Sequence, residues 1–119
     1  MNGEPRGPQA SRLRQRKFAL LRRFPIPTDL LPGALTRGYT RCGNPRCHCA
    51  QNRGHEAWTL TFTVTGQRHV ERIPRDWVEG VRQRVEAGRE FQDAVREVLA
   101  ANAQLLVLAR QQRKKRKRG

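Results

Sequence analysis

Residues 58–65 alternate strictly between a large apolar residue and threonine. Neighbouring side chains of a strand point to opposite faces, so this pattern predicts a half-buried β-strand with its threonines facing out. The apolar residues expected to face a core are Trp58, Leu60, Phe62 and Val64. Residues 65–67 then predict a turn, and residues 68–73 predict the second strand of a β-hairpin. Because a lone hairpin is marginally stable in water, we expect it to pack against the helix that follows.

A helical period begins at Trp77 and continues almost to the C-terminus. Pro74 ends the second strand, and Asp76 with Glu79 three residues later matches a capping box at the start of the helix. The apolar stripe consists of Val81, Val85, Phe91, Val95, Val98, Leu99, Ala103, Leu105, Leu106 and Ala109, with Asn102 as a polar break. Gly88 lowers helical propensity, so the sequence predicts either one long helix or two helices that turn back at this glycine.

The stripe is heptad-like over about three repeats, and cover by the hairpin accounts only for its first half, which leaves the second half from Phe91. That length is sufficient for an antiparallel helix pair or for the seam of a dimer, and it exceeds what a small hairpin can cover. We therefore expect this part of the stripe to be buried against another helix of the chain, a protein partner or a second copy. The residues concerned are Phe91, Val95, Val98, Leu99, Leu105 and Leu106.

The N-terminal part is basic and interrupted by glycine and proline. Residues 1–10 are expected to form a disordered leader, because they are almost without apolar side chains. Ser11 predicts the N-cap of a short basic amphipathic helix that ends near Phe24, and Pro25 and Pro27 then favour an extended path. The apolar face of this helix is short, which disfavours binding to a membrane surface.

Charge is concentrated at the two ends of the chain. The 119 residues include 25 Lys and Arg against 10 Asp and Glu, a formal net charge of +15. Eleven basic residues and two acids precede Glu56, whereas seven basic residues and no acid follow Glu97. Two basic regions around a nearly neutral middle indicate a polyanionic partner, nucleic acid before membrane. The alternative is that the basic ends serve solubility alone.

All three cysteines and two of the three histidines fall within residues 42–55. Three thiolates and one imidazole are an established tetrahedral set for structural zinc, with no coordination position open to a substrate. The predicted ligands, spaced Cys-x4-Cys-x-Cys-x5-His, are Cys42, Cys47, Cys49 and His55. Turn residues at positions 43–45 allow the loop to fold back on itself. We name residues 41–54 the cysteine loop.

His48 is the alternative fourth ligand, although its place between Cys47 and Cys49 directs it away from a metal that both neighbours bind. The Cys-x-Cys pair is tighter than the Cys-x2-Cys pair common in zinc sites. Free thiols or a redox pair are the other interpretations, because three cysteines cannot pair completely in disulfides. No apolar run suited to a secretion signal or a membrane span is present, which predicts a cytoplasmic protein.

These elements together predict the α+β class. The expected architecture is a small zinc-stapled loop and β-hairpin followed by a long C-terminal helix or helical hairpin, with a short basic N-terminal helix. The expected divisions are a leader over residues 1–10, the basic helix and proline-rich linker over 11–29, the zinc-knuckle, hairpin and helical domain over 30–109, and a basic tail over 110–119.

The first functional hypothesis is a zinc-stapled nucleic-acid-binding protein that contacts the phosphate backbone without reading base sequence. Tyr39 and Trp58 flank the cysteine loop and can stack on unpaired bases, although strand alternation favours a core position for Trp58. No motif distinguishes DNA from RNA. The predicted contacts are Arg12, Arg14, Arg16, Lys17, Arg37, Tyr39, Arg41, Arg46, Arg53, Arg113, Lys114, Lys115, Arg116, Lys117 and Arg118.

The second hypothesis is an accessory subunit of a transposase or another nucleoprotein complex, which docks through the long helix. Enzymatic activity is not expected. The sequence shows no paired carboxylates, no Ser-His-Asp set and no phosphate-binding glycine loop.

The chain resembles a family of small, uncharacterised bacterial and archaeal proteins, a domain of unknown function often found beside mobile elements. The family pattern has a Leu-Pro-Gly-Ser-Leu-like leader, an aromatic residue before Arg-Cys-Gly-x-x-x-Cys-x-Cys, a His-Gly-Pro-Tyr-Trp-like segment, a hairpin ending near proline and a long helix. The matching residues are Leu31-Pro32-Gly33-Ala34-Leu35, Tyr39, Arg41-Cys42-Gly43, Cys47, Cys49, His55, Trp58 and Pro74. Glu56-Ala57 stands where the pattern has Gly-Pro. The resemblance implies the fold over roughly residues 30–106 and no established activity.

Overall fold

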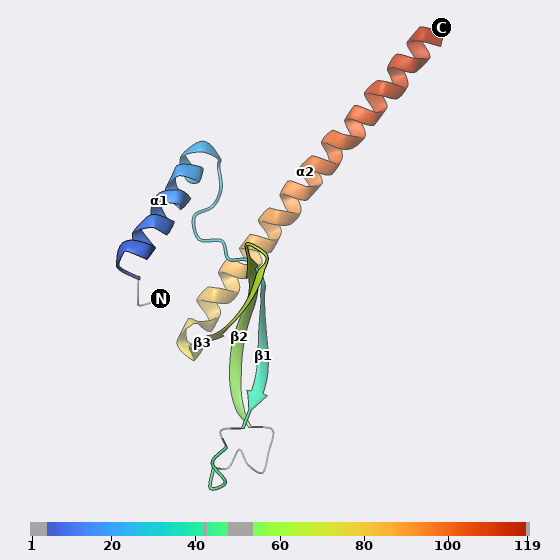
Figure 1. The fold of residues 1–119 in the computed structure, drawn as a ribbon. Coiled ribbons are helices and arrows are strands. Elements are labelled where there is room, and N and C mark those ends of the chain that lie inside the picture. The colour runs from blue at the N-terminus through green and yellow to red at the C-terminus, as the bar shows by residue number, and fades with distance from the viewer. Residues whose placement is uncertain (1–4, 42, 48–53, 119) are drawn as a thin grey trace.

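The computed structural model describes the backbone of residues 5–41, 43–47 and 54–118, and the side chains of these ranges as far as Lys115. The elements in these ranges are α1 (Pro8–Arg23), β1 (Ala34–Thr40), β2 (His55–Val64), β3 (Gln67–Ile73), the 3-10 helix η2 (Arg75–Trp77) and α2 (Val78–Arg118). The strands form one antiparallel sheet in the order β1-β2-β3. The start of α2 lies beside this sheet, and the rest of the helix continues far beyond it (Figure 1). The expected α+β class is confirmed.

The predicted hairpin is present, and a third strand extends it. β2 and β3 are joined by a two-residue turn in which Thr65 and Gly66 both have positive φ, 49° and 82°, as in the hairpin turns that match strand twist. The sequence analysis did not predict β1. This strand pairs with β2 from Ala34 opposite Thr61 to Thr40 opposite His55, which makes β2 the central strand.

The core lies between α2 and one face of the sheet. Leu60, Val81 and Val85 are 5%, 3% and 5% exposed. The partly buried apolar residues around them are Leu31, Leu35, Phe62, Ile73 and Trp77. Placing Leu60 and Phe62 toward a core was correct, but placing Val64 there was wrong, because it adjoins the hairpin turn and is 47% exposed.

The segment between α1 and β1 crosses α2 at Gly88. The backbone N–H of Leu31 donates to the Arg84 carbonyl at 3.1 Å, and Arg84 Nε donates to the Asp29 carbonyl at 2.7 Å. A Cβ atom at position 88 would overlap the carbonyl oxygen of Leu31. Gly88 therefore marks a close backbone approach, and α2 runs through it without a break for 41 residues. The helical-hairpin alternative is wrong.

Both predicted helix starts need correction. α1 begins at Pro8, not after Ser11, so residues 8–10 belong to the helix and not to a leader. Proline is favourable there because its missing N–H would have no partner in a first turn. Asp76 lies inside η2, whose N-cap is Pro74 without a side-chain hydrogen bond, so no capping box forms at this residue. The predicted basic tail is a continuation of α2 to Arg118.

The molecule divides into a head, residues 29–88, and an arm, residues 89–118. The arm gives the chain its longest dimension, 84 Å (Figure 1). Phe91 is partly buried, but the remaining stripe residues of the arm are 42–65% exposed. These residues are Val95, Val98, Leu99, Leu105 and Leu106. The expectation that another helix of the same chain buries them is therefore wrong for the described structure.

α1 contributes no buried residue, and its Leu13, Phe18 and Leu20 are exposed. Figure 1 shows it beside the head, attached through the extended linker. Within the described ranges, no helix combines the length and apolar character that crossing a membrane requires.

Candidate metal centre and nucleic-acid interface

The cysteine loop joins β1 to β2 at the end of the sheet remote from the arm (Figure 1). Thr40 and His55 form the last residue pair between β1 and β2 before the loop. Gly54, with φ of 97°, lies so near β1 that a Cβ atom would come within 2.7 Å of the Thr40 carbonyl carbon and 2.9 Å of the Arg41 nitrogen. Any larger residue would push the strands apart. Glycine at position 54 thus places His55 at the mouth of the loop.

A tight turn brings Cys47 to the same place. The backbone N–H of Cys47 donates to the Asn44 carbonyl at 3.0 Å, and the N–H of Arg46 donates to Asn44 Oδ1 at 3.0 Å. Asparagine commonly stabilises turns by such a side-chain bond. Cys47 Sγ lies 3.3 Å from His55 Nε2, and both residues are partly buried.

The Cys47–His55 separation fits two ligands of one tetrahedral zinc ion. With ordinary Zn–S and Zn–N bond lengths, sulfur and nitrogen ligands lie about 3.5 Å apart. The separation also fits a hydrogen bond between the two side chains. Cys42, Cys49 and the alternative ligand His48 lie outside the described residues. The described part therefore brings two of the four predicted ligands together, and it contains no group of three potential ligands.

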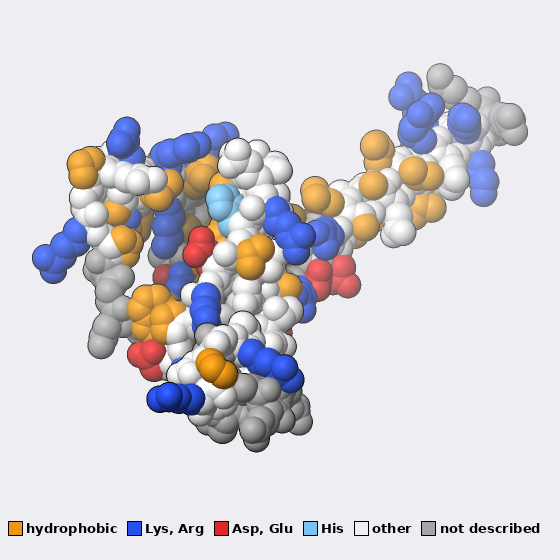
Figure 2. Space-filling model, turned by 60° about the horizontal axis from the view of Figure 1, so that its bottom comes forward, with side chains coloured by type: hydrophobic (Ala, Val, Ile, Leu, Met, Phe, Trp, Pro, Cys, Tyr) orange, Lys and Arg blue, Asp and Glu red, His pale blue; other side chains and the backbone are white. Residues whose placement is uncertain are grey.

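The predicted phosphate contacts lie on three separate parts of the chain. Figure 2 shows basic side chains on α1, around the sheet and near the end of the arm, with apolar side chains along the arm between them. Arg14 on α1 donates to the Pro5 carbonyl, and Lys17 lies 4.0 Å from Asp29. Arg14 is partly buried. The exposed residues among the remaining predicted contacts are Arg12, Arg16, Arg37, Tyr39, Arg41, Arg46, Arg113, Lys114 and Lys115. The predicted contacts with no described side chain are Arg53, Arg116, Lys117 and Arg118.

Two arginines surround Trp58. The guanidinium of Arg82 lies 5.2 Å from the ring centroid of Trp58, and that of Arg37 lies 6.0 Å from the same ring. The indole N–H donates to Glu56 Oε1 at 2.7 Å. Arg37 also lies 5.9 Å from the ring of Tyr39, which is 40% exposed. Cation–π contacts and the hydrogen bond hold Trp58 in place, whereas Tyr39 keeps much of its ring open to solvent.

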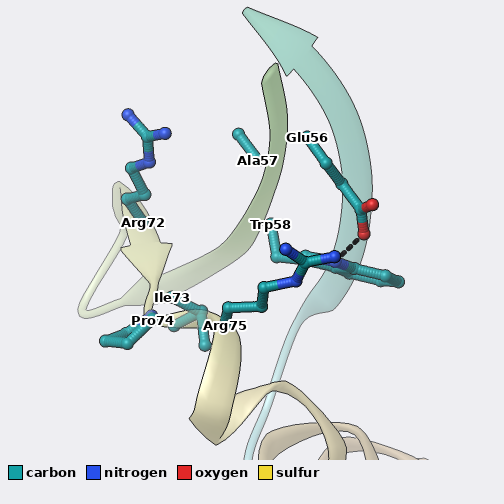
Figure 3. Close-up of a pocket in the computed structure, with 7 residues that line it drawn as sticks. All are labelled: Glu56, Ala57, Trp58, Arg72, Ile73, Pro74 and Arg75. Atoms are coloured by element: carbon teal, nitrogen blue, oxygen red, sulfur yellow. Dashed lines mark hydrogen bonds between the residues drawn. The ribbon is translucent and has the colours of Figure 1, made fainter.

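A pocket of about 350 Å³ opens beside Trp58, where β2 extends past the end of β3. Figure 3 shows Arg75 directed toward Trp58 and Glu56, while Arg72 points away from them. Glu56 lines the same pocket, so the pocket carries both acidic and basic side chains. The lining residues are Glu56, Ala57, Trp58, Arg72, Ile73, Pro74 and Arg75.

Sequence reasoning missed Arg72, Arg75 and Arg82 because they belong to the nearly neutral middle of the chain. The pairing of Trp58 with Ile73 places Arg72 and Arg75 on either side of Ile73 in the chain, beside the tryptophan. A register worked back from the Thr65-Gly66 turn would have found them. His69, the histidine outside the cysteine loop, stacks on Phe62 with 5.1 Å between ring centroids.

Comparison with known proteins identifies a family whose function is unknown. Neither the search of curated proteins nor the search of solved structures found a match. A family model described as a domain of unknown function, DUF6788, matches residues 10–83. That range spans most of α1, the whole sheet and the first turns of α2, and it covers more than half of the chain. The chain belongs to the DUF6788 family.

Proposed function

We propose that this protein binds nucleic acid through the phosphate backbone and that a zinc ion staples its cysteine loop. The observation that carries the proposal is the excess of 25 basic over 10 acidic residues, together with the exposure of the basic side chains on α1, β1, the cysteine loop and the arm. When such a surface binds a polyanion, the counterions condensed on the polyanion are released. This contribution to affinity depends little on base sequence. Zinc, partner and backbone-directed binding remain predictions.

The proposed zinc ion has a structural role. Cys42, Cys47, Cys49 and His55 would complete a closed tetrahedron, so the metal would supply folding energy and no catalytic chemistry. Its support in the described residues is the contact between Cys47 and His55. A closed site at the strand ends would hold Arg41 and Arg46 in defined positions. Ordering these arginines before binding lowers the entropic cost of contacting phosphate.

Tyr39 is the better candidate for stacking on an unpaired base. The residue is 40% exposed, and its ring lies 5.9 Å from the guanidinium of Arg37, which can contact the phosphate next to a stacked base. Trp58 serves the fold instead, because Arg37, Arg82 and Glu56 already occupy its surroundings. Its partly buried position agrees with the interpretation favoured by strand alternation.

A salt titration of binding tests the proposal. Fluorescence anisotropy with duplex and single-stranded oligonucleotides of mixed sequence should show log affinity falling linearly with log salt concentration and changing little with sequence. The longest dimension of 84 Å corresponds to about 25 base pairs of duplex at 3.4 Å each, so probes of that length suit the measurement. Deleting residues 113–119 removes six basic residues and should flatten the slope markedly.

A second variant, with Arg41, Arg46 and Arg53 replaced by glutamine, should weaken binding further while leaving the tail intact. The head should keep its melting temperature in the tail deletion, because the described core residues Leu60, Val81 and Val85 lie far before residue 113 in the chain. Equal affinity of the parent and both variants across the titration would refute backbone binding.

The second candidate function, docking within a nucleoprotein complex, is supported by the exposed apolar side chains of the arm. It predicts that the arm binds an unlike protein, whereas nucleic-acid binding by the head requires no such partner. The charge distribution along the arm indicates a different occupant, argued next.

A further inference from the structure

The arm carries an apolar face that the described structure leaves uncovered. The large apolar side chains of this face, which are 42–65% exposed, are Val95, Val98, Leu99, Leu105 and Leu106. Figure 2 shows apolar side chains along the arm. Helices in folded proteins draw most of their stability from packing of an apolar face. We infer that a second copy of this chain covers the arm, with the two arms antiparallel.

The spacing of the face is that of a helix pair. Core positions separated alternately by four and three residues are Phe91, Val95, Val98, Asn102, Leu105 and Ala109. This is the repeat of a seam in which side chains of one helix fill holes in another. Asn102 is the polar member of the set, and a single asparagine in such a seam fixes register and partner number at some cost in stability.

The free segment of α2 is long enough for two copies to cover each other from end to end. The Leu31 segment crosses α2 at Gly88, so the part of α2 free of the head is residues 89–118. The midpoint of this segment lies between residues 103 and 104. An antiparallel pair centred there covers both free segments from end to end, and it brings the two Asn102 residues near the two-fold axis. Such an arrangement is self-complementary and closed, as most homodimers are.

Charge decides the orientation. In a parallel pair, the basic ends of the two arms, including Arg113 and Lys115, would lie side by side, with the helix axes about 8–10 Å apart. Screening over such a distance is incomplete at physiological ionic strength, where the Debye length is about 8 Å. In the antiparallel pair, the basic segment 110–115 of one arm lies beside residues 92–97 of the other arm, which include two acids and one arginine.

The acids on that part of the arm support the same orientation. Glu90 and Glu97 are exposed, and the described side chains provide neither with an ion-pair partner. Asp93 lies 3.6 Å from Arg96 of its own helix. No acid follows Glu97, so the antiparallel pair places the purely basic end of each arm beside the acid-containing half of the other.

Analytical ultracentrifugation of the full chain tests the pairing. The expected mass is twice the 13.7 kDa of one chain, without added nucleic acid. Val98→Asp with Leu105→Asp puts two charges in the seam and should raise the dimer dissociation constant at least about 100-fold. The matched control is Ala100→Asp with Val107→Asp, which has the same charge and spacing on the opposite face of the helix. The control should stay dimeric.

Photo-crosslinking tests the orientation. A benzophenone side chain in place of Val95 should crosslink near residue 112 of the other copy, as peptide mass mapping would show. Crosslinks near residue 95 would overturn the antiparallel arrangement, and crosslinks within residues 8–23 of a monomer would show that α1 covers the arm. A monomer at 100 µM, a larger assembly or an equal response of control and seam variants would overturn the dimer. Nucleic-acid binding by a monomeric protein would leave the proposed function intact.

Discussion

The two halves of α2 share one apolar period and differ completely in what surrounds them. Val81 and Val85 in the head are 3% and 5% exposed, whereas Val98 and Leu105 in the arm are 59% and 62% exposed. Helical spacing therefore predicts which side chains share a face, but not what covers that face. The head supplies a sheet and the Leu31 segment as cover, and the arm extends past both.

The family match follows the same division. It ends at residue 83, inside the head, so the whole arm lies outside it. The part shared with the family contains the sheet, the cysteine loop and the aromatic and arginine residues around Trp58. The arm adds a long helix whose role has to be argued from its own charge and apolar face.

Loss of the proposed zinc ion is expected to have the largest effect, and this effect should be confined to the head. Cys47→Ser should release one zinc per chain and lower head stability by at least about 3 kcal/mol, because ligand binding energy in small zinc sites is folding energy. Metal analysis would follow the zinc, and near-ultraviolet circular dichroism of Trp58 and Trp77 would follow the head.

His48→Ala is the control for this prediction, since it should keep the metal if His55 is the fourth ligand. Loss of zinc in His48→Ala together with its retention in His55→Ala would show that His48, and not His55, is the fourth ligand. If the Cys47→Ser protein kept one zinc and melted at the same temperature as the parent, the proposed zinc site would be wrong.

A valine-to-alanine substitution should lower the free energy of unfolding much more in the head than in the arm. Val85→Ala removes two buried methyl groups and should lower the free energy of unfolding by about 2 kcal/mol, including the cavity left behind. Val107→Ala, on the outer face of the arm, should change it by less than about 0.5 kcal/mol. Urea denaturation of the head, followed by tryptophan fluorescence, measures both. Similar costs at both positions would show that the outer face of the arm is also covered.

Glycine-to-alanine changes should differ in sign along the head. Gly88→Ala introduces a methyl group where the Leu31 carbonyl lies and should cost about 1–2 kcal/mol, because the linker must shift. Gly80→Ala meets no atom within 4 Å and should stabilise the helix by up to about 1 kcal/mol. Thermal melts of the two variants provide the comparison. Stabilisation by both would mean that the linker does not cross α2 at Gly88 in solution.

Local patterns predicted the hairpin and the long helix well, since alternation and helical period are written in adjacent residues. β1 was missed because Ala34–Thr40 lacks a long apolar alternation, and its place in the sheet depends on pairing with residues 15–27 positions away. The sequence left the choice between one helix and two at Gly88 open for a related reason. The low helical propensity of this glycine is a local property, whereas its contact with Leu31 is made across the fold.

The candidate site shows the same limit. Spacing alone nominated Cys47 and His55, and the fold brought their side chains to 3.3 Å through the Asn44 turn and the close approach at Gly54. The arginines near Trp58 escaped notice because their proximity arises from strand register and the start of α2.

The sequence by itself determined the α+β class, the excess positive charge and the composition of each helix and strand face, because these depend on residue types and short periods. Only the tertiary structure decided which of those faces is covered. Burial of Val85 and exposure of Leu105 follow from where the sheet and the Leu31 segment end along α2. That boundary depends on contacts between distant residues, and no periodicity within the helix encodes it.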